Sequence, residues 1–415
     1  MLLQGIFRLI LCYIFFAKRT SSNGIEKYPQ LRFNGYSNPW TTQKLGNLGT
    51  FIKGAPLSKA DISDEGNPFI LYGELYTTYS EVTHSVKRKT AKTVEQQFYS
   101  KIGDVIMPTS GETPEDIATA SCIMLPDVIL AGDLLIYRTE QIDGRFVSYA
   151  IKNKVNKQIS SVAQGKSVVH VRADELAKIC ITFPALDEQK KILNLLELLD
   201  TRIATQQSLI ETLKKYKRGL NIRLLSGISM SYSKRLGDVC SIIGGGTPDT
   251  TTAKFWDGGI NWFTPSEIGK TKYVVSSLRS ISYDGMLKSS AKLLPQNTVL
   301  LTTRATLGEM SILQSEATTN QGFQSLIPSE EILAEYVYYL QVIIKPWCEK
   351  YASGNTFREI SKSALSNCLI PVPDISTQNK LVRVLSGIDQ HIEHEKDILD
   401  KLRDQKKALL QQLFI

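Results

Sequence analysis

Residues 192–224, ILNLLELLDTRIATQQSLIETLKKYKRGLNIRL, place apolar side chains at alternating steps of four and three. This spacing is the heptad pattern of a helix with one apolar seam. Residues 381–413, LVRVLSGIDQHIEHEKDILDKLRDQKKALLQQL, repeat it, and every matching position is shifted by the same 189 residues. The chain is therefore a tandem duplication.

The predicted seam consists of the apolar heptad positions of both repeats. These positions are Ile192, Leu196, Leu199, Ile203, Ile210, Leu213, Leu220, Leu224, Leu381, Leu385, Ile388, Ile392, Leu399, Leu402, Leu409 and Leu413. Each 33-residue stretch makes a helix of roughly 50 Å. A helix with one apolar seam needs a partner, and we expect the two helices to pair as an antiparallel coiled coil with pseudo-twofold symmetry.

Both seams are interrupted by polar residues at matching places, Gln206 and Lys217 in the first and Glu395 and Lys406 in the second. Polar seam residues can fix the register of paired helices. One hypothesis therefore pairs Gln206 with Glu395 and Lys217 with Lys406. The alternative is that these long side chains bend towards solvent at the edge of the seam.

Short β-like runs separated by Gly, Pro and Asp precede each helix, which predicts an α+β class for both globular parts. We expect an N-terminal extension (1–26), a first globular domain (27–185) with its helix (186–226), and a second domain (227–374) with its helix (375–415).

The duplication extends upstream of the helices. Gln189 matches Gln378 and Gly165 matches Gly354, again 189 residues apart, whereas the bodies of the two domains agree poorly. The helices and the segments that enter them are repeated, whereas the sequences of the globular domains differ. Such a pattern indicates that the helices share one architectural task while the globular parts do different jobs of one kind.

The composition is that of an ordinary globular protein, with 42% hydrophobic and 22% charged residues. The net charge of +8 permits a polyanionic partner such as nucleic acid. The six cysteines are scattered and form no CxxC pair, so we expect neither a zinc site nor a disulfide framework. A reducing cytoplasm is the expected location.

The N-terminal run from Leu2 to Phe16 is apolar but short, and it contains Arg8. A membrane-spanning helix needs about 20 apolar residues, and Lys18 and Arg19 follow the run instead of preceding it as in a secretory signal. We expect an extension outside a fold that starts near Lys27, and no membrane partner.

Four stretches together resemble the specificity subunit of type I restriction–modification systems. They are KYPQLRFNGYSNPWTTQKLGNL (27–48), GGGTPDTTTAKFWDGGINWFTPSEI (244–268), TTNQGFQSLIP (318–328) and SGNTFREISKSALSNCLIPVPDISTQNKL (353–381). The first domain lacks the GGGTP and TNQGF strings and is expected to belong to a different recognition subtype.

The resemblance implies two target recognition domains, each reading one half of an asymmetric, bipartite sequence in double-stranded DNA. It also implies that the long helices set the gap between the half-sites and dock two modification subunits, which methylate adenine. Restriction subunits then supply translocation and cleavage. We expect no cofactor on this chain, because S-adenosylmethionine, ATP and magnesium belong to the partner subunits.

The chain lacks the catalytic motifs of these partners, so we expect no catalytic residue. There is no GxxxxGK[ST] phosphate-binding loop, no NPPY-like tetrapeptide and no FxGxG. His391 and His394 stand beside Glu393 and Glu395, but on a charged helix a solvated face is the simpler interpretation, and we expect no metal site.

DNA-contact candidates in the second domain are polar residues in or beside the loops of the family-like strings, since Arg, Lys, Asn, Gln, Thr and Ser contact bases or phosphates. They are Thr247, Lys254, Thr264, Ser266, Arg304, Thr306, Asn320, Gln321, Asn355, Thr356 and Arg358. Trp256, Trp262 and Phe323 are expected to pack in the interior.

In the first domain the candidates are cations suited to phosphate contacts, although each is equally consistent with a solvated surface charge. They are Lys53, Lys59, Lys87, Arg88, Lys89, Lys92, Lys166, His170 and Arg172. Two other functions stay open: a coiled-coil scaffold or decoy that binds the partner subunits without a defined DNA target, and an intrinsic nuclease or methyltransferase.

Overall fold

The computed structural model describes residues 15–17, 28–165, 169–304, 306–354 and 358–415. Asn355, Thr356 and Lys166, which are candidate contacts, lie outside the described residues.

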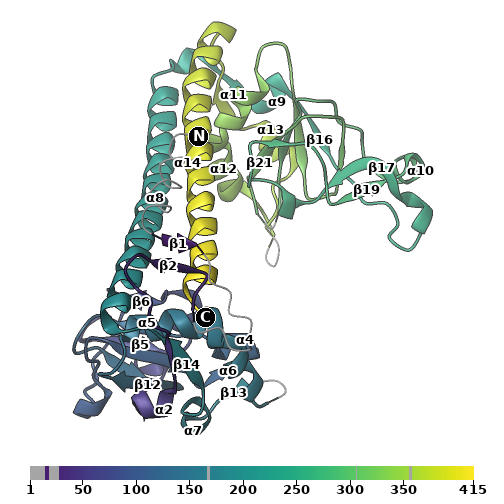
Figure 1. The fold of residues 1–415 in the computed structure, drawn as a ribbon. Helices are drawn as coiled ribbons and strands as arrows, with labels where there is room; N and C mark the ends of the chain where they lie inside the picture. The colour runs from purple at the N-terminus through teal and green to yellow at the C-terminus, as the bar shows by residue number, and fades with distance from the viewer. Residues whose placement is uncertain (1–14, 18–27, 166–168, 305, 355–357) are drawn as a thin grey trace. The chain divides into compact units, whose positions relative to one another are not determined.

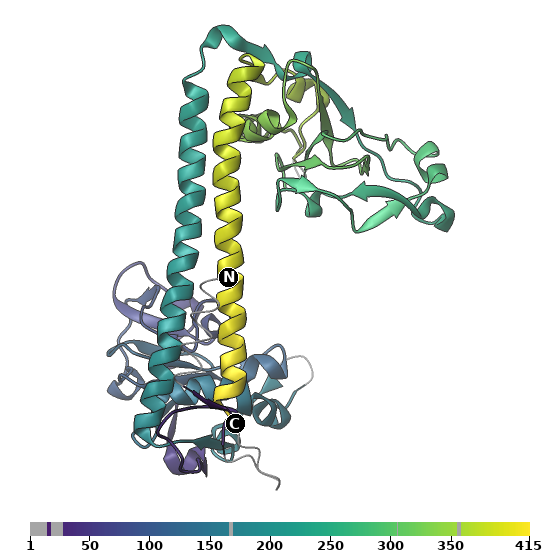
Figure 2. The same ribbon diagram turned by 45° about the horizontal axis from the view of Figure 1, so that its top comes forward.

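The chain forms two compact units. Unit 1 contains Met1–Thr205 and Leu399–Ile415, and unit 2 contains Gln206–Ile398. Helix α8 (Leu186–Ser226) and helix α14 (Ile375–Leu413) are both unbroken, as Figures 1 and 2 show in teal and yellow. Each unit is therefore built from one repeat and the terminal part of the helix of the other repeat.

Unit 1 has a five-stranded sheet in the order β4-β12-β8-β10-β6, with smaller sheets beside it (Figure 1). The large sheet contains β4 (Gly49–Lys53), β12 (Leu134–Thr139), β8 (Asp104–Pro108), β10 (Ser121–Ile123) and β6 (Val82–Thr83). A three-stranded sheet contains β11 (Ile129–Ala131), β5 (Asn67–Leu71) and β7 (Arg88–Thr90). The unit also has three two-stranded sheets. They pair β3 (Thr41–Lys44) with β14 (Cys180–Phe183), β9 (Ser110–Gly111) with β13 (Val169–His170), and β1 (Phe15–Ala17) with β2 (Leu31–Phe33).

Unit 2 repeats this topology. Its five-stranded sheet contains β16 (Cys240–Gly244), β23 (Gln324–Pro328), β20 (Val299–Leu301), β21 (Met310–Leu313) and β18 (Tyr273–Val274), in that order. Beside it lie β19 (Arg279–Ile281), β17 (Trp256–Phe263) and β22 (Thr318–Thr319) in one sheet, and β15 (Ser233–Arg235) with β24 (Leu369–Pro371) in another. In both large sheets the last pair, β10·β6 or β21·β18, is parallel. The duplication thus includes the globular bodies, where the sequences hardly agree.

The central strands read as short apolar runs because they are covered on both faces. All five residues of β8 and all three of β20 are buried. Strands with both faces covered do not alternate polar and apolar residues.

The matching glutamines Gln189 and Gln378 hold the start of each long helix against its own globular body. Each donates a hydrogen bond from Nε2 to the carbonyl of the proline five residues before it, at 2.8 Å. The Oε1 atom accepts the backbone N–H of Asp143 at 3.0 Å in unit 1 and of Leu333 at 2.9 Å in unit 2. Both side chains are buried and their amide groups are satisfied, which explains their retention without any chemistry.

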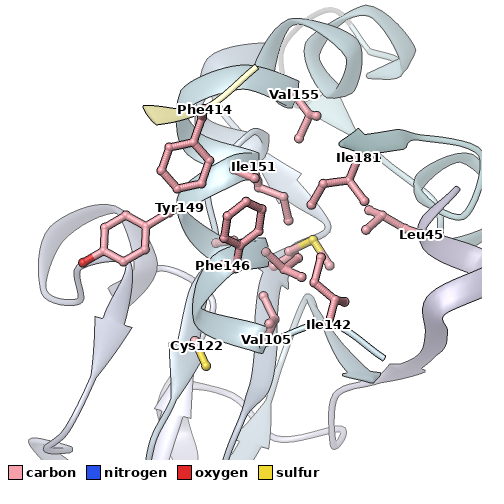
Figure 3. Close-up of a cluster of buried hydrophobic side chains, with 14 of the residues drawn as sticks. Leu45, Val105, Cys122, Ile142, Phe146, Tyr149, Ile151, Val155, Ile181 and Phe414 are labelled. Atoms are coloured by element: carbon pink, nitrogen blue, oxygen red, sulfur yellow. The ribbon is translucent and has the colours of Figure 1, made fainter. Parts of the chain in front are cut away.

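The predicted seam residues are all buried or half-buried. In unit 1, Leu409, Leu413 and Phe414 from the end of the chain join the core of the first repeat. The ring of Phe414 lies 4.9 Å from that of Phe146 and 6.5 Å from that of Tyr149, between centroids (Figure 3). The last residues of the chain therefore complete the core of its first domain.

Replacing Phe414, which is 2% exposed, by alanine should lower the free energy of unfolding of unit 1. Removing a buried phenylalanine ring typically costs about 3–5 kcal/mol, since it loses burial and leaves a cavity. Urea unfolding of the full chain measures the change. The control Gln411→Ala removes an exposed side chain three residues earlier, and equal stability of the two variants would contradict the packing described.

A Tyr–Asp–Lys cluster in unit 1 crosses from one repeat to the other. Tyr149 donates from Oη to Asp200 Oδ2 at 2.5 Å, and Lys406 Nζ lies 2.6 Å from Asp200 Oδ1. The Lys406 ammonium also lies 5.3 Å from the centre of the Tyr149 ring. Tyrosine and aspartate come from the first repeat, and lysine comes from the helix of the second.

Unit 2 contains the same cluster with the repeats exchanged. Tyr339 donates to Asp389 Oδ2 at 2.6 Å, Lys217 forms an ion pair with Asp389, and its Nζ lies 5.3 Å from the Tyr339 ring centre. The pairing of Lys217 with Lys406 is therefore wrong, because two ammonium groups repel and each lysine has an aspartate within reach.

The other predicted polar pair is present. Gln206 Nε2 donates to the carbonyl of Glu395 at 3.0 Å and to its carboxylate. Within unit 2 the contacts of residues 206 and 217 on α8 with residues 395 and 389 on α14 require opposite chain directions. The side chains of Lys217 and Lys406 are only 21% and 14% exposed, so they do not bend out to solvent.

Part of the N-terminal extension belongs to the fold. Strand β1 (Phe15–Ala17) pairs antiparallel with β2 (Leu31–Phe33). The described residues of the expected extension, 15–17, thus pair with a strand of the first domain. Among the described residues, no helix is long and apolar enough to cross a membrane.

The buried Glu81 predicts how unit 1 responds to acid. Lys406 Nζ lies 3.2 Å from Glu81 Oε2 and Lys152 Nζ lies 3.2 Å from Oε1. Burial alone would raise the pKa of Glu81, but the two ammonium groups outweigh it and hold the pKa below its ordinary value. The folded carboxylate thus takes up its proton at lower pH than the unfolded one.

The stabilisation from Glu81 is accordingly complete above the pKa of an unfolded glutamate and is lost as the pH falls through the depressed folded pKa. Glu81→Gln should lower the free energy of unfolding by about 1.5–3 kcal/mol at neutral pH and flatten its decline in acid. Urea unfolding between pH 7 and pH 3 tests this. The exposed Glu140→Gln is the control, and parallel pH curves for both variants would contradict the prediction.

Candidate nucleic-acid interface

Four loops of unit 2 are joined by backbone hydrogen bonds at one end of its sheets. The N–H of Gly246 bonds Thr319 O at 2.9 Å and that of Asn320 bonds Phe263 O at 3.1 Å. The loop that contains Thr303 is connected to the others by a hydrogen bond from the Thr303 N–H to the carbonyl of Gly322, at 2.8 Å. The structure thereby brings together family-like strings that are far apart in the sequence.

Four side chains form a continuous chain across these loops. Thr247 Oγ1 donates to Gln321 Oε1, and Arg304 Nη2 donates to the Gln321 carbonyl at 2.9 Å. The same Nη2 lies 3.8 Å from Glu359 Oε1. Arg304 Nε is buried and has no partner within the described part of the chain. Three of the predicted contacts, Thr247, Arg304 and Gln321, are therefore neighbours.

Thr264, Ser266 and Thr306 lie on an adjoining part of the same surface. The N–H and Oγ1 of Thr264 both bond Glu267 Oε2, at 2.8 and 2.7 Å, so its hydroxyl already caps the following turn. Ser266 is exposed, with its Oγ 3.1 Å from Thr264 Oγ1. The exposed Thr306 reaches the carbonyl of Pro265 at 3.5 Å.

The remaining described candidates of unit 2 differ in role. Asn320 Oδ1 accepts the N–H of Gly322 at 2.8 Å and so shapes its own turn. Arg358 is exposed and donates to the backbone carbonyls of Glu349 and Ala352. Lys254 lies on the 3-10 helix η5 (Ala253–Phe255), and among the described residues no hydrogen bond or ion pair of its side chain joins it to the four loops.

The aromatic residues of these strings are buried, as predicted. Trp256, Trp262 and Phe323 are 8%, 5% and 1% exposed. Sequence reasoning nevertheless missed Arg279, whose guanidinium carbon lies 3.7 Å from the centre of the Trp256 ring. Arg279 falls outside every family-like string, and only the pairing of β17 with β19 brings it to the tryptophans.

The same pair of backbone hydrogen bonds occurs at equivalent places in both units. Backbone bonds of 2.9 and 2.8 Å join Gln164 with His170, and bonds of 3.0 and 2.9 Å join Ser353 with Glu359. Gly165 follows Gln164 and Gly354 follows Ser353, and their φ angles are 139° and 115°, a region that favours glycine. The retained glycines thus adopt the same backbone region beside these bonds in both units.

A second equivalence locates the counterpart of Arg304. Val171 donates its N–H to Thr109 O at 3.0 Å in unit 1, as Ile360 does to Thr303 O at 3.3 Å in unit 2. The residue that follows Thr109 is Ser110, which is 5% exposed, whereas Arg304 follows Thr303. At this equivalent position of the fold, unit 1 therefore has the small, buried side chain of Ser110 and unit 2 has the arginine Arg304.

The basic run of unit 1 lies on and beside β7, an edge strand of its sheet. Lys87, Lys89 and Lys92 are exposed, whereas Arg88 Nε pairs at 2.9 Å with the buried carboxylate of Glu74. Arg88 thus stabilises the fold at this strand, and the three lysines remain candidates for phosphate contacts.

The other basic candidates of unit 1 are spread over separate elements. Lys53 ends β4, and Lys59 lies on the 3-10 helix η1 (Lys59–Asp61); both are exposed. His170 is exposed on β13. Arg172 is 71% exposed but bonds acidic neighbours in the turn that follows it.

Comparisons with known proteins identify the family. The family model described as the type I restriction modification DNA specificity domain matches residues 37–215 and 231–404. The chain belongs to this family. The specificity subunit of the type I restriction enzyme MjaIX from Methanocaldococcus jannaschii is 35% identical over 176 residues, which cover 41% of this chain and 41% of that relative. The putative MjaX specificity subunit of the same organism is 21% identical over 93% of this chain and 95% of the relative.

Two solved structures share the fold of this chain. One is the S subunit of the type I restriction–modification system of M. genitalium, with a TM-score of 0.54 and 18% identity over 93% of this chain and 99% of that one. The other comes from work on complex assembly and conformational transition of the type I R-M system, with a TM-score of 0.60 and 20% identity over 91% of this chain and 99% of that one.

The described residues of this chain contain no group of three or more His, Cys, Asp or Glu side chains arranged to hold a metal ion. On α14, His391 Nε2 lies 3.0 Å from Glu395 Oε1, one helical turn away. The Gln206 amide also contacts this carboxylate, so the histidine belongs to a polar network on the helix.

Arg304→Gln should weaken DNA binding by unit 2. It removes a cation and a planar donor from the centre of the four loops, and one such contact typically contributes about 1–3 kcal/mol. Titration of target DNA at fixed salt measures the loss, and urea unfolding checks that the loops remain folded. The matched control is Arg235→Gln on the exposed β15 of the same unit. Equal affinity of the two variants would remove Arg304 from the interface.

Proposed function

We propose that this chain is the DNA-specificity subunit of a type I restriction–modification complex and that its two units read the two halves of an asymmetric, bipartite target. One observation carries the proposal: two units with the same strand order and the same loop frame present different side chains at equivalent places. Ser110 in unit 1 and Arg304 in unit 2 are the clearest example.

The chemistry of the unit 2 loops supports contact with DNA. Arginine can bond the O6 and N7 atoms of guanine, and glutamine can bond the N6 and N7 atoms of adenine. Arg304 and Gln321 are neighbours, and Thr247 holds the glutamine amide. Lysines such as those beside β7 can position unit 1 on the phosphate backbone without reading sequence.

The two long helices are proposed to act as an antiparallel coiled-coil spacer that sets the gap between the half-sites. The crossed Tyr–Asp–Lys clusters and the Gln206–Glu395 pair support this role, because each links one repeat to the helix of the other. A slip of one residue would break these polar contacts and turn apolar seam residues towards solvent.

Catalysis is proposed to come from the partners. By family resemblance, two modification subunits would methylate adenine with S-adenosylmethionine, and restriction subunits would cleave with ATP and magnesium. The chain would direct both activities to one sequence without a catalytic residue of its own, in the cytoplasm.

Genome-wide mapping of adenine methylation, with and without this gene, tests the function. A split motif should appear with the gene and vanish without it. A coiled-coil scaffold or decoy would instead leave the methylation map unchanged and yield no motif in a selection from random DNA. Methyl transfer or cleavage by the purified chain alone would favour an intrinsic enzyme.

The spacer hypothesis has its own test. Inserting four helical residues into both α8 and α14, at exposed positions, lengthens each helix by about 6 Å, or roughly two base pairs of DNA. The gap of the methylated motif should grow while the recognised bases stay the same. Four simultaneous substitutions at the same exposed positions are the control, and an unchanged gap would remove the spacer role.

A further inference from the structure

We propose that Arg279 is a base-reading residue of unit 2, held against Trp256 so that the edge of its guanidinium meets a guanine in the major groove. This inference rests on the proposed function. It adds a specificity-determining residue that lies outside the family-like strings, and it names the base that the residue recognises.

The backbone places Arg279 beside the loops of the interface. Strand β19 runs antiparallel to β17, with Arg279 opposite Trp262. Ser277 fixes the approach to this strand, since its Oγ donates to the Arg279 carbonyl at 2.6 Å and its N–H bonds Asn261 Oδ1 at 3.1 Å. The arginine therefore stands at a defined register on a paired strand and not on a free loop.

Two tryptophans form the platform under the guanidinium. The ring centres of Trp256 and Trp262 lie 5.1 Å apart at 89° to each other. Trp256 Nε1 donates to Asp249 O at 3.1 Å, and Trp262 Nε1 donates to Gly246 O at 2.8 Å. Both acceptors belong to the loop that carries Thr247, so these two hydrogen bonds join the platform to the interface loops.

The donors of Arg279 are free. Its guanidinium carbon lies 3.7 Å from the Trp256 ring centre, which is a stacking distance. Within the part of the chain that the structure describes, its side chain makes no hydrogen bond or ion pair, whereas Arg304 and Arg358 both donate to backbone carbonyls of the protein. Arg279 is exposed, so these donors can reach a ligand.

A stacked arginine suits base recognition. The planar fork matches two acceptors at once, and stacking orders the side chain before it binds, which reduces the entropy lost on binding. Guanine offers O6 and N7 as such a pair in the major groove. The ordering costs little here because a cation over a tryptophan face is itself favourable.

The neighbour of Arg279 favours a base over a phosphate. Leu278 is 86% exposed, and its N–H is held by Glu267 Oε1 at 2.7 Å. A large apolar side chain kept in solvent gains nothing beside a phosphate, but it can contact the methyl group of a thymine in the major groove. Because Leu278 and Arg279 are consecutive, an exposed apolar side chain lies next in the chain to the free donors of Arg279.

Arg279→Lys tests the proposal with the partner-assembled complex, since lysine keeps the charge and loses the planar fork. Selection from random DNA should show a guanine position of the unit 2 half-site relaxed, while the unit 1 half-site stays unchanged. Affinity for the original target should fall about 10-fold or more, with an unchanged salt dependence. The control is Arg235→Lys, an exposed arginine of the same unit on β15.

Three results would overturn the proposal. A salt dependence that weakens in Arg279→Ala, with every base preference retained in both variants, would make Arg279 a phosphate contact. A lower midpoint of thermal unfolding with unchanged DNA binding would make the stack purely structural. Wild-type DNA behaviour in Arg279→Lys would exclude a role for the fork. If selection with the wild-type complex returned no DNA motif at all, the proposed function itself would fail. Failure of the Arg279 proposal and failure of the proposed function are therefore distinguishable.

Discussion

A helix with a single apolar seam cannot remain alone in water, and the rest of this structure depends on how the chain satisfies that constraint. Each repeat covers only the start of its own seam, where Ile192, Leu196 and Leu199 join the core of unit 1 and Leu381 and Leu385 join that of unit 2. The core of unit 1 contains Leu409, Leu413 and Phe414 from the second repeat, and the core of unit 2 contains Leu225 from the first. Each globular domain is therefore completed by the helix of the other repeat, and both repeats must be present for either core to be whole.

The polar contacts of the seam follow the same exchange. Lys217 and Lys406 occupy equivalent positions, and each binds an aspartate and lies over a tyrosine of the other repeat. Buried charges are tolerated only when they are paired and hydrogen-bonded. The two clusters thus make the correct partner helix and the correct register a condition for burying the lysine.

The globular parts show where the duplication has been kept and where it has diverged. The strand order, the buried glutamines, and Gly165 and Gly354 are retained because they determine backbone position. The side chains on the loops are free to differ, and Arg304 has Ser110 as its counterpart. A frame that places varied side chains at one end of a sheet suits a protein whose relatives are specificity subunits.

The sequence by itself determined the duplication, the two long helices, the seam and the burial of the tryptophans, because periodicity and matched spacing are local properties of the chain. It also selected Thr247, Arg304 and Gln321 as candidate contacts, and the structure shows that they are neighbours. It could not determine that Lys217 and Lys406 each bind an aspartate of the other repeat, or that Arg88 forms an ion pair with Glu74. Nor could it select Arg279, since that residue meets Trp256 only through strand pairing. These contacts join residues distant in sequence, and only the tertiary structure decides which charged groups lie within bonding distance.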